Sequence, residues 1–227
     1  MNKQIIKLKN IRKSFRHKNG VLEIFKNINL EIKMGELVAL VGPSGSGKSS
    51  LLHLLALLDK PNSGDIIFYG KNSKDFDDEQ KNLIRREKIS IIFQDNNLLN
   101  DFTMIENVIM PLIIRGENYS QSLHKAKKIL KELKLSNRLA HFPSELSGGE
   151  QQRVAIARSL VAKTNLILAD EPTGNLDYKT SQEIFAHFLK LKKLNKAIIF
   201  ATHNRELADK ADYKLSISNC NIKRVNG

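Results

Sequence analysis

The chain has 227 residues, of which 41% are hydrophobic and 27% charged, and its formal net charge at pH 7 is +13. This size and composition fit one globular domain with a buried core and exclude an intrinsically disordered chain. Apolar runs such as residues 37–42 and 198–202 have the length of strands, far short of the roughly 20 residues that span a bilayer. The single cysteine, Cys220, excludes an internal disulfide and a cysteine-rich zinc site.

The excess of positive charge is spread along the chain. Many lysines fall on polar helix faces, as in residues 124–134. We therefore expect a solvated basic surface facing anionic lipid headgroups and no direct nucleic-acid binding. The alternative, a nucleic-acid surface, predicts salt-sensitive binding to RNA or DNA. The amino terminus, MNKQIIKLKN, lacks the apolar core and cleavage site of a secretory signal, so we expect a cytosolic protein.

Strands dominate the first part of the chain. QIIKLKNI (4–11) and KNINLEIK (26–33) alternate apolar and polar side chains as half-buried strands do, and ELVALVG (36–42) is a continuous apolar run typical of a buried strand. We expect a mixed sheet to begin with these three strands. A helix is predicted from about Lys48 to Leu58, and a strand follows at residues 65–70.

The middle of the chain is predicted to be mostly helical, with Ser120 as the N-cap of one helix. Strands return at residues 165–170 and 197–202, and an amphipathic helix lies between them. This alternation predicts an α/β fold with a helical insertion between about residues 95 and 150. The apolar positions at helical spacing are Leu123, Ala126, Ile129, Leu130 and Leu133 in the first helix, and Ile184, Phe185, Phe188 and Leu189 in the second.

The stretch GPSGSGKS, residues 42–49, fits the phosphate-loop pattern G-x-x-x-x-G-K-[ST] between a buried strand and a helix. Glycines let backbone N–H groups surround phosphate oxygens, and the helix adds the positive end of its dipole. The pattern predicts that Lys48 reaches the β- and γ-phosphates and that Ser49 binds Mg²⁺; the alternative is a glycine-rich turn without a ligand. The predicted nucleotide-binding residues here are Gly42, Pro43, Ser44, Gly45, Ser46, Gly47, Lys48, Ser49 and Ser50.

A second motif, LILADE (166–171), is an apolar strand that ends in two carboxylates. Asp170 is predicted to support the Mg²⁺ shell. Glu171, one residue further, is predicted to polarise a water molecule for attack on the γ-phosphate. Such an ending by itself is typical of a surface turn, but together with a phosphate loop it indicates nucleotide hydrolysis.

A third motif, LSGGEQQRVAIAR (146–158), resembles the signature of ATP-binding cassette (ABC) ATPases, and the resemblance extends along essentially the whole chain. Four further features agree in order: Phe15, Gln94 after ISIIF, NLD (175–177) and His203. The resemblance implies a single nucleotide-binding domain over residues 1–227, with a RecA-like mixed-sheet core, an antiparallel β subdomain and an α-helical subdomain inserted at about residues 95–160. It also implies hydrolysis of ATP with Mg²⁺.

In that family two nucleotide-binding domains pair head to tail, which implies a homodimer of this chain. The resemblance implies that Ser147, Gly148, Gly149 and Glu150 contact ATP held by the partner subunit. Such a contact is physically reasonable because small residues before a helix leave its N–H groups free to approach an anion. Asp177 is then expected at the dimer interface, where it couples the two sites.

The resemblance assigns the remaining site roles as follows. Gln94 is expected to contact Mg²⁺ and the attacking water, and His203 to hold the γ-phosphate and orient Glu171. Phe15 is expected to stack on adenine, although tyrosine is commoner there and a core phenylalanine is the alternative. Ser50 and Asn204 also depart from the threonine and aspartate that are more usual in the family.

Residues 98–112 (LLNDFTMIENVIMPL) resemble a subfamily that serves lipoprotein release, macrolide efflux and cell division, and residues 51–68 are most similar to its lipoprotein-releasing members. This implies a peripheral protein on the cytoplasmic face of the inner membrane, beneath two transmembrane subunits that contact the lipoprotein cargo. We expect the surface near Gln94 and residues 98–115 to bind a cytoplasmic helix of these subunits. Charge reversal at Asp101 or Glu106 is expected to weaken partner assembly more than ATP binding.

Other functions remain open from the sequence. The nearest alternatives are a cell-division ATPase and a macrolide-efflux ATPase. Translation-associated cassette proteins typically carry two cassettes in tandem in one chain, whereas this sequence has one phosphate loop and one signature. A chromosome-maintenance ATPase needs long coiled coils, and no sustained heptads lie between Lys48 and Asp170.

Overall fold

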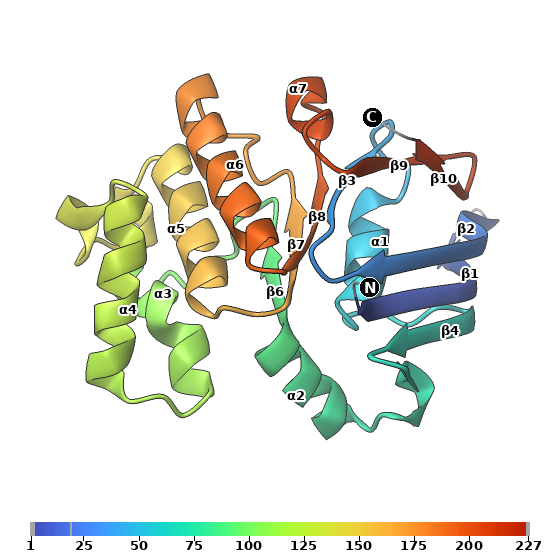
Figure 1. Ribbon diagram of the computed structural model, residues 1–227, viewed down its shortest axis with the longest axis horizontal. Helices are drawn as coiled ribbons and strands as arrows, with labels where there is room; N and C mark the ends of the chain where they lie inside the picture. The colour runs from blue at the N-terminus through green and yellow to red at the C-terminus, as the bar shows by residue number, and fades with distance from the viewer. Residues whose placement is uncertain (1–2, 19, 226–227) are drawn as a thin grey trace.

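The computed structural model describes residues 3–18 and 20–225, which form two β-sheets flanked by helices (Figure 1). The smaller sheet is antiparallel and has the strand order β2-β1-β4-β5. Its long hairpin of β1 and β2 supplies most of its area. The strands are β1 (Gln4–His17), β2 (Gly20–Lys33), β4 (Ser63–Phe68) and β5 (Lys71–Asn72).

The larger sheet is mixed and has the order β10-β9-β3-β8-β7-β6. All of its neighbouring strands are parallel except β10, which pairs antiparallel with β9. Parallel strands bring their carboxyl ends to one edge, and this is where ligands bind in such sheets. The strands are β3 (Leu37–Val41), β6 (Ile89–Ile92), β7 (Leu166–Asp170), β8 (Ala197–Ala201), β9 (Tyr213–Ser218) and β10 (Asn221–Val225).

Helices cover both faces of the mixed sheet. α1 lies between it and the antiparallel sheet, whereas α3, α4, α5 and α6 lie on the other side (Figure 1). The α-helices of the described residues are α1 (Lys48–Leu55), α2 (Asp78–Lys88), α3 (Met104–Ile114), α4 (Tyr119–Glu132), α5 (Gly148–Val161), α6 (Tyr178–Lys193) and α7 (Arg205–Ala208). Single 3₁₀ turns occur at Ser73–Asp75, Ser136–Arg138 and Pro143–Glu145.

The two faces of the mixed sheet belong to two separate cores. Val38 and Leu40 of β3 pack toward α1, while Leu37 and Ala39 pack toward the helical layer, because successive strand side chains point to opposite faces. On the helical side, the rings of Phe185 and Phe200 meet edge to face at 5.4 Å. Burial on both faces explains why these strands are apolar without alternation.

The structure confirms the α/β class and corrects several details. Residues 4–11 and 26–33 do not begin the mixed sheet: they belong to the separate antiparallel sheet, and β3 pairs instead with β8 and β9. The predicted helix 48–58 ends at Leu55, because Leu57 adopts a left-handed φ of 57° and the amide of Leu58 donates to the carbonyl of His53.

The predicted N-cap Ser120 is also wrong, since α4 begins at Tyr119 and its cap is Asn118, whose side chain accepts from the amide of Gln121 at 3.2 Å. The core alternative for Phe15 is wrong too, because this side chain is 43% exposed. Helix α2 and strands β9 and β10 were not predicted.

Candidate functional site

The loop between β3 and α1 has a shape that requires glycine. Gly42, Gly45 and Gly47 all have positive φ, at 154°, 76° and 102°. A Cβ on Gly42 would lie 2.6 Å from the carbonyl oxygen of Ile217, and one on Gly47 would lie 2.7 Å from Cγ2 of Ile24. Other residues would strain the loop or push it away from these neighbours.

The polar groups of this loop are arranged to receive an anion. The buried ammonium of Lys48 donates to the carbonyl oxygens of Gly42 at 3.0 Å and Pro43 at 3.1 Å. The buried hydroxyl of Ser46 has no hydrogen-bond partner in the structure. α1 starts at Lys48, and its N-cap residue Gly47 has no side chain to cap it, so the first amide groups of the helix are free. A phosphate fits these donors, because buried polar groups normally have partners.

Ser49, Gln94 and Asp170 are among the oxygen-bearing side chains that line a cavity beside this loop. Mg²⁺ prefers oxygen ligands and in nucleotide sites is commonly held by one or two carboxylates together with substrate phosphates. In the described part of the chain, no group of three or more His, Cys, Asp or Glu residues is placed to hold a metal ion by itself. A donor set with one carboxylate therefore fits Mg²⁺ shared with a bound phosphate.

Glu171 occupies a tight turn directly after β7. Its φ of 46° is left-handed, which is uncommon for a residue with a side chain, and its amide donates to the carbonyl of Ala201 at 3.1 Å. The amide of His203 approaches Oε2 of Glu171 at 3.4 Å, and Nε2 of His203 lies 3.5 Å from Oε1. Burial raises the pKa of Glu171, and the nearby His203 and Lys48 partly oppose this increase. This carboxylate is a suitable proton acceptor.

These elements meet in one cavity of about 320 Å³ at the carboxyl edge of the mixed sheet. Residues predicted from separate motifs thus become neighbours, and only Ile24 comes from the antiparallel sheet. The residues that line the cavity are Ile24, Ser44, Gly45, Gly47, Lys48, Ser49, Ser50, Gln94, Asp170, Glu171 and His203. The predicted residues outside this lining are Phe15, Gly42, Pro43, Ser46, Asp177 and the signature residues.

The signature lies at the start of α5. Ser147 is the N-cap: its hydroxyl accepts from the amide of Glu150 at 3.3 Å and donates to the Glu150 carboxylate at 3.0 Å. The amide of Ser147 also donates to that carboxylate, and this bond lowers the pKa of Glu150 despite some burial. A Cβ on Gly148 would meet nothing within 4 Å, so this turn is open on its outer side. Glu150 therefore serves the helix cap.

Asp177 has a similar local role at the start of α6. It is the N-cap, and its carboxylate accepts from the amide of Thr180 at 3.0 Å and from the hydroxyl of Thr180 at 2.6 Å. These two bonds lower the pKa of Asp177. The loop before it touches the signature, since a Cβ on Gly149 would lie 3.4 Å from the carbonyl oxygen of Asn175. The signature and the Asp177 loop thus form one continuous surface.

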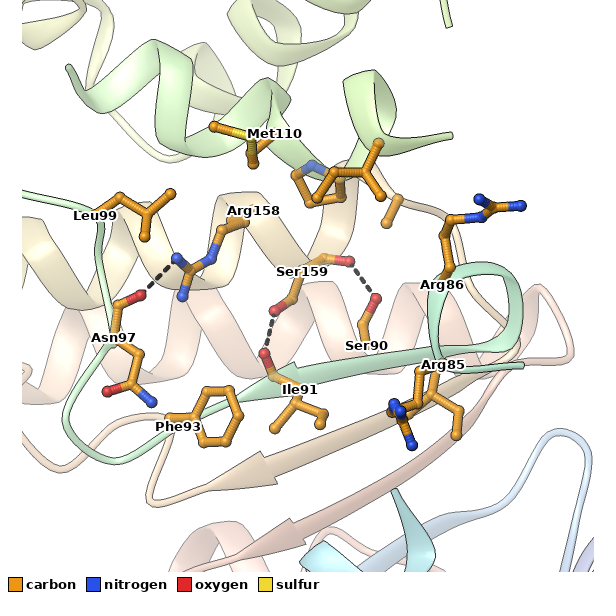
Figure 2. A pocket seen from close by; sticks show the side chains of 14 residues that line it. Arg85, Arg86, Ser90, Ile91, Phe93, Asn97, Leu99, Met110, Arg158 and Ser159 are labelled. Carbon is orange, nitrogen blue, oxygen red and sulfur yellow. Dashed lines mark hydrogen bonds between the residues drawn. The ribbon is translucent and has the colours of Figure 1, made fainter. Parts of the chain in front are cut away.

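A second cavity, of about 360 Å³, lies among β6, α2, α3 and α5 (Figure 2). The guanidinium of Arg158 on α5 donates to the carbonyls of Asn96 and Asn97, each at 2.7 Å, and holds both residues in the left-handed region. Phe93 and Asn97 line this cavity while Gln94 lines the nucleotide cavity, so the loop after β6 borders both. The lining residues are Arg85, Arg86, Ile89, Ser90, Ile91, Phe93, Asn97, Leu99, Met110, Pro111, Ile114, Arg158, Ser159 and Ala162.

Sequence reasoning missed Arg158 and the arginines of α2. In the sequence, Arg158 is simply an arginine that follows Ala157 in an apolar stretch. The structure shows that its neighbours Ala157 and Ser159 are both buried. Its partners lie 61 and 62 residues away, at positions that no local pattern connects to it.

Comparison with known proteins identifies relatives along the whole chain. "Lipoprotein-releasing system ATP-binding protein LolD" of Rickettsia bellii is 50% identical over 218 residues, which are 95% of this chain and 96% of the relative. The protein of the same name from Rickettsia felis is 49% identical, covering 98% of this chain and all of the relative, and that of Paramagnetospirillum magneticum is 42% identical, covering 96% and 97%.

Solved structures agree with this result. The dimeric post-hydrolysis state of the ATP-binding cassette MJ0796 bound to ADP and Pi has a TM-score of 0.94 to this chain at 36% identity, with 98% of each chain covered. A second dimeric structure of MJ0796, described as a bacterial ABC transporter cassette, has a TM-score of 0.93 at 38% identity, again with 98% of each chain covered. A family model described as ABC transporter matches residues 25–174. The resemblance drawn from the motifs is confirmed, and the chain belongs to the ABC transporter family.

Proposed function

We propose that this chain is the ATP-hydrolysing subunit of an ABC transporter that releases lipoproteins from the inner membrane toward the outer membrane. The observation that carries the ATPase assignment is the single cavity in which the phosphate loop, Asp170, Glu171 and His203 meet. The cargo assignment is supported by relatives named for lipoprotein release that match at 42–50% identity over nearly the whole chain.

Different residues of the cavity have different roles in hydrolysis. The loop amides and Lys48 would bind the phosphates, and Ser49, Gln94 and Asp170 would hold Mg²⁺, which would supply charge neutralisation. Glu171 accepts the proton of the attacking water, and its raised pKa makes it a stronger base than an exposed carboxylate. The backbone amide of His203 holds Glu171 in place, and the His203 side chain lines the same cavity, where it would contact the γ-phosphate of bound ATP.

We propose that the working unit is a homodimer. Ser147, Gly148 and Gly149 do not line the cavity of their own chain, and the open side of Gly148 can approach an anion held by a second copy. In this arrangement Asp177 lies at the subunit interface and couples the two sites, because its loop packs on Gly149. The carboxylate of Glu150 supports the signature indirectly through its bonds to Ser147.

The membrane partner is proposed to bind the cavity shown in Figure 2. None of the helices described between residues 3 and 225 is long and apolar enough to cross a bilayer. An amphipathic helix with an acidic residue suits this cavity, because Leu99, Met110 and Ile114 offer apolar contacts and Arg85 and Arg86 a positive border. The partners are two transmembrane subunits of the LolC and LolE kind, which contact the cargo, and this chain is peripheral on the cytoplasmic face of the inner membrane.

Glu106, where charge reversal is expected to weaken partner assembly, has a local role at the start of α3. Glu106 accepts hydrogen bonds from the amide of Thr103 at 2.8 Å and from its hydroxyl at 2.6 Å, so it caps the helix. Charge reversal at Glu106 would therefore damage α3 itself, whereas Asp101 is exposed and remains a cleaner probe of partner binding.

The test is affinity purification of tagged Glu171→Gln protein from its own membranes with ATP present, followed by mass spectrometry. Two related membrane subunits together with acylated lipoproteins are the expected result. A single division-type membrane protein with wall-hydrolase regulators, or an efflux partner, would keep the ATPase assignment and overturn the cargo.

A further inference from the structure

Lys13 and Phe15 of β1 form a contact that the proposed mechanism does not use. The ammonium of Lys13 lies 4.6 Å from the centroid of the Phe15 ring, which is within cation–π distance. Lys13 is only 7% exposed, whereas Phe15 is 43% exposed. A buried cation therefore covers one part of the ring, and much of the rest faces solvent.

Lys13 is fixed in this place by the turn after α1. Its ammonium donates to Oδ1 of Asp59 at 2.7 Å and to the carbonyl of Lys60 at 2.9 Å. The same turn is attached to β1 a second time, since the amide of Ser14 donates to the side chain of Asn62 at 2.6 Å. These contacts hold the cation against the ring.

The ring also lies close to the phosphate loop. Phe15 pairs across the hairpin with Leu22, and Leu22 is two residues before Ile24, which lines the nucleotide cavity. This spacing puts the Phe15–Leu22 pair about 7 Å along the strand from the cavity. An exposed aromatic ring at this distance from a phosphate site is suited to stack on the base of a nucleotide.

We propose that Lys13 is a positioning residue for base binding. Its ammonium occupies the inner side of the Phe15 ring and holds the ring so that the adenine of ATP stacks on the outer side. The cation also draws π-electron density inward, which reduces the repulsion between the outer face of the ring and the base. This inference rests on the proposed ATP binding and adds to it a residue that touches the ring and not the nucleotide.

The test compares a ligand that has a base with one that has none. ATP and inorganic tripolyphosphate are titrated with Mg²⁺ into the full-length Glu171→Gln protein by calorimetry. Lys13→Met is expected to weaken ATP binding by about three- to tenfold and to leave tripolyphosphate binding unchanged. Lys13→Arg keeps a cation over the ring and is expected to restore most of the ATP affinity.

Two further variants separate this role from a structural one. Lys13→Met combined with Asp59→Asn removes the unpaired charge that the single variant leaves, and it is expected to show the same loss for ATP alone. In a Phe15→Leu background, Lys13→Met is expected to have no further effect, because the ring through which it acts is gone.

Four outcomes count against these ideas in distinguishable ways. Equal weakening of ATP and tripolyphosphate by Lys13→Met, or a full effect without the Phe15 ring, would overturn the positioning role. Normal ATP binding by the Lys13→Met protein would overturn it too. If the protein with Lys13 intact bound neither ligand, the proposed ATP binding itself would fail.

Discussion

Replacement of Glu171 by glutamine tests the central step of the mechanism. Glutamine keeps the shape of the side chain and an oxygen that can accept from the amide of His203, but it cannot take a proton. The only other carboxylate that lines the cavity is Asp170, which we assign to Mg²⁺. General-base catalysis typically contributes about 10²–10⁴-fold, so we expect kcat for ATP hydrolysis to fall by that factor.

ATP binding should be retained or become tighter, because the substitution removes a negative charge beside the phosphates. The assay is steady-state phosphate release together with calorimetric binding of Mg-ATP. Glu206→Gln is the matched control, since Glu206 is an exposed, ion-paired glutamate on α7 outside the cavity, and its activity should be unchanged. Hydrolysis by Glu171→Gln at the normal rate would refute the assignment of the base.

The difference in stability between Glu171→Gln and the unmodified protein is expected to depend on pH. Burial raises the folded-state pKa of Glu171 above the ordinary value of a glutamate, which it keeps in the unfolded chain. Between the unfolded and folded pKa values the folded protein binds more protons, so its stability falls as the pH rises through this window. Glu171→Gln lacks this loss and should have the higher Tm at pH 7, with a difference that shrinks as the pH falls through the folded-state pKa toward the unfolded value. A Tm difference independent of pH would contradict this reasoning.

Four other substitutions test the remaining parts of the site and the partner surface. Lys48→Ala should weaken ATP binding by about 10- to 100-fold in calorimetry, because it removes a charge-assisted contact to the phosphates, and unchanged affinity would exclude that contact. Gly148→Ala should leave Tm unchanged or higher, since the added Cβ meets nothing within 4 Å, yet lower ATP hydrolysis at least about tenfold if the partner's phosphate approaches there; normal hydrolysis would argue against the signature contact. Asp101→Lys should reduce co-purification of the membrane subunits without a change in Tm, whereas Glu106→Lys should also destabilise the protein by about 0.5–2 kcal/mol through loss of the α3 cap; equal Tm values for both variants would contradict the cap.

The phosphate loop could be predicted from sequence because its geometry depends on contiguous residues. Glycines, the lysine and the following serine are all within residues 42–49, and the flanking strand and helix have clear patterns. The carboxyl-end position of Asp170 and Glu171 was predictable for the same reason. The local sequence does not reveal the distance in space between these motifs. The parallel pairing of β3 with β8 and of β7 with β8 brings them together.

Features that depend on distant partners could not be predicted. α2 has no buried residue, so it has no apolar periodicity to mark it. Lys13 looks like an ordinary surface lysine until Asp59, 46 residues away, is found beside it. Ser120 and Asn118 are both good N-cap residues, and the choice between them is made by where α4 packs.

The position of β8 in the mixed sheet has a consequence for biosynthesis. β8 comes from residues 197–201, yet it lies between β3 and β7, and its end supplies the carbonyl that holds the amide of Glu171. A nascent chain on the ribosome can form the β1–β2 hairpin early, but it cannot join the phosphate-loop strand to the catalytic strand until residue 201 has emerged. A nascent chain that has not yet presented β8 therefore lacks both the hydrogen bond from Glu171 to Ala201 and an assembled nucleotide site.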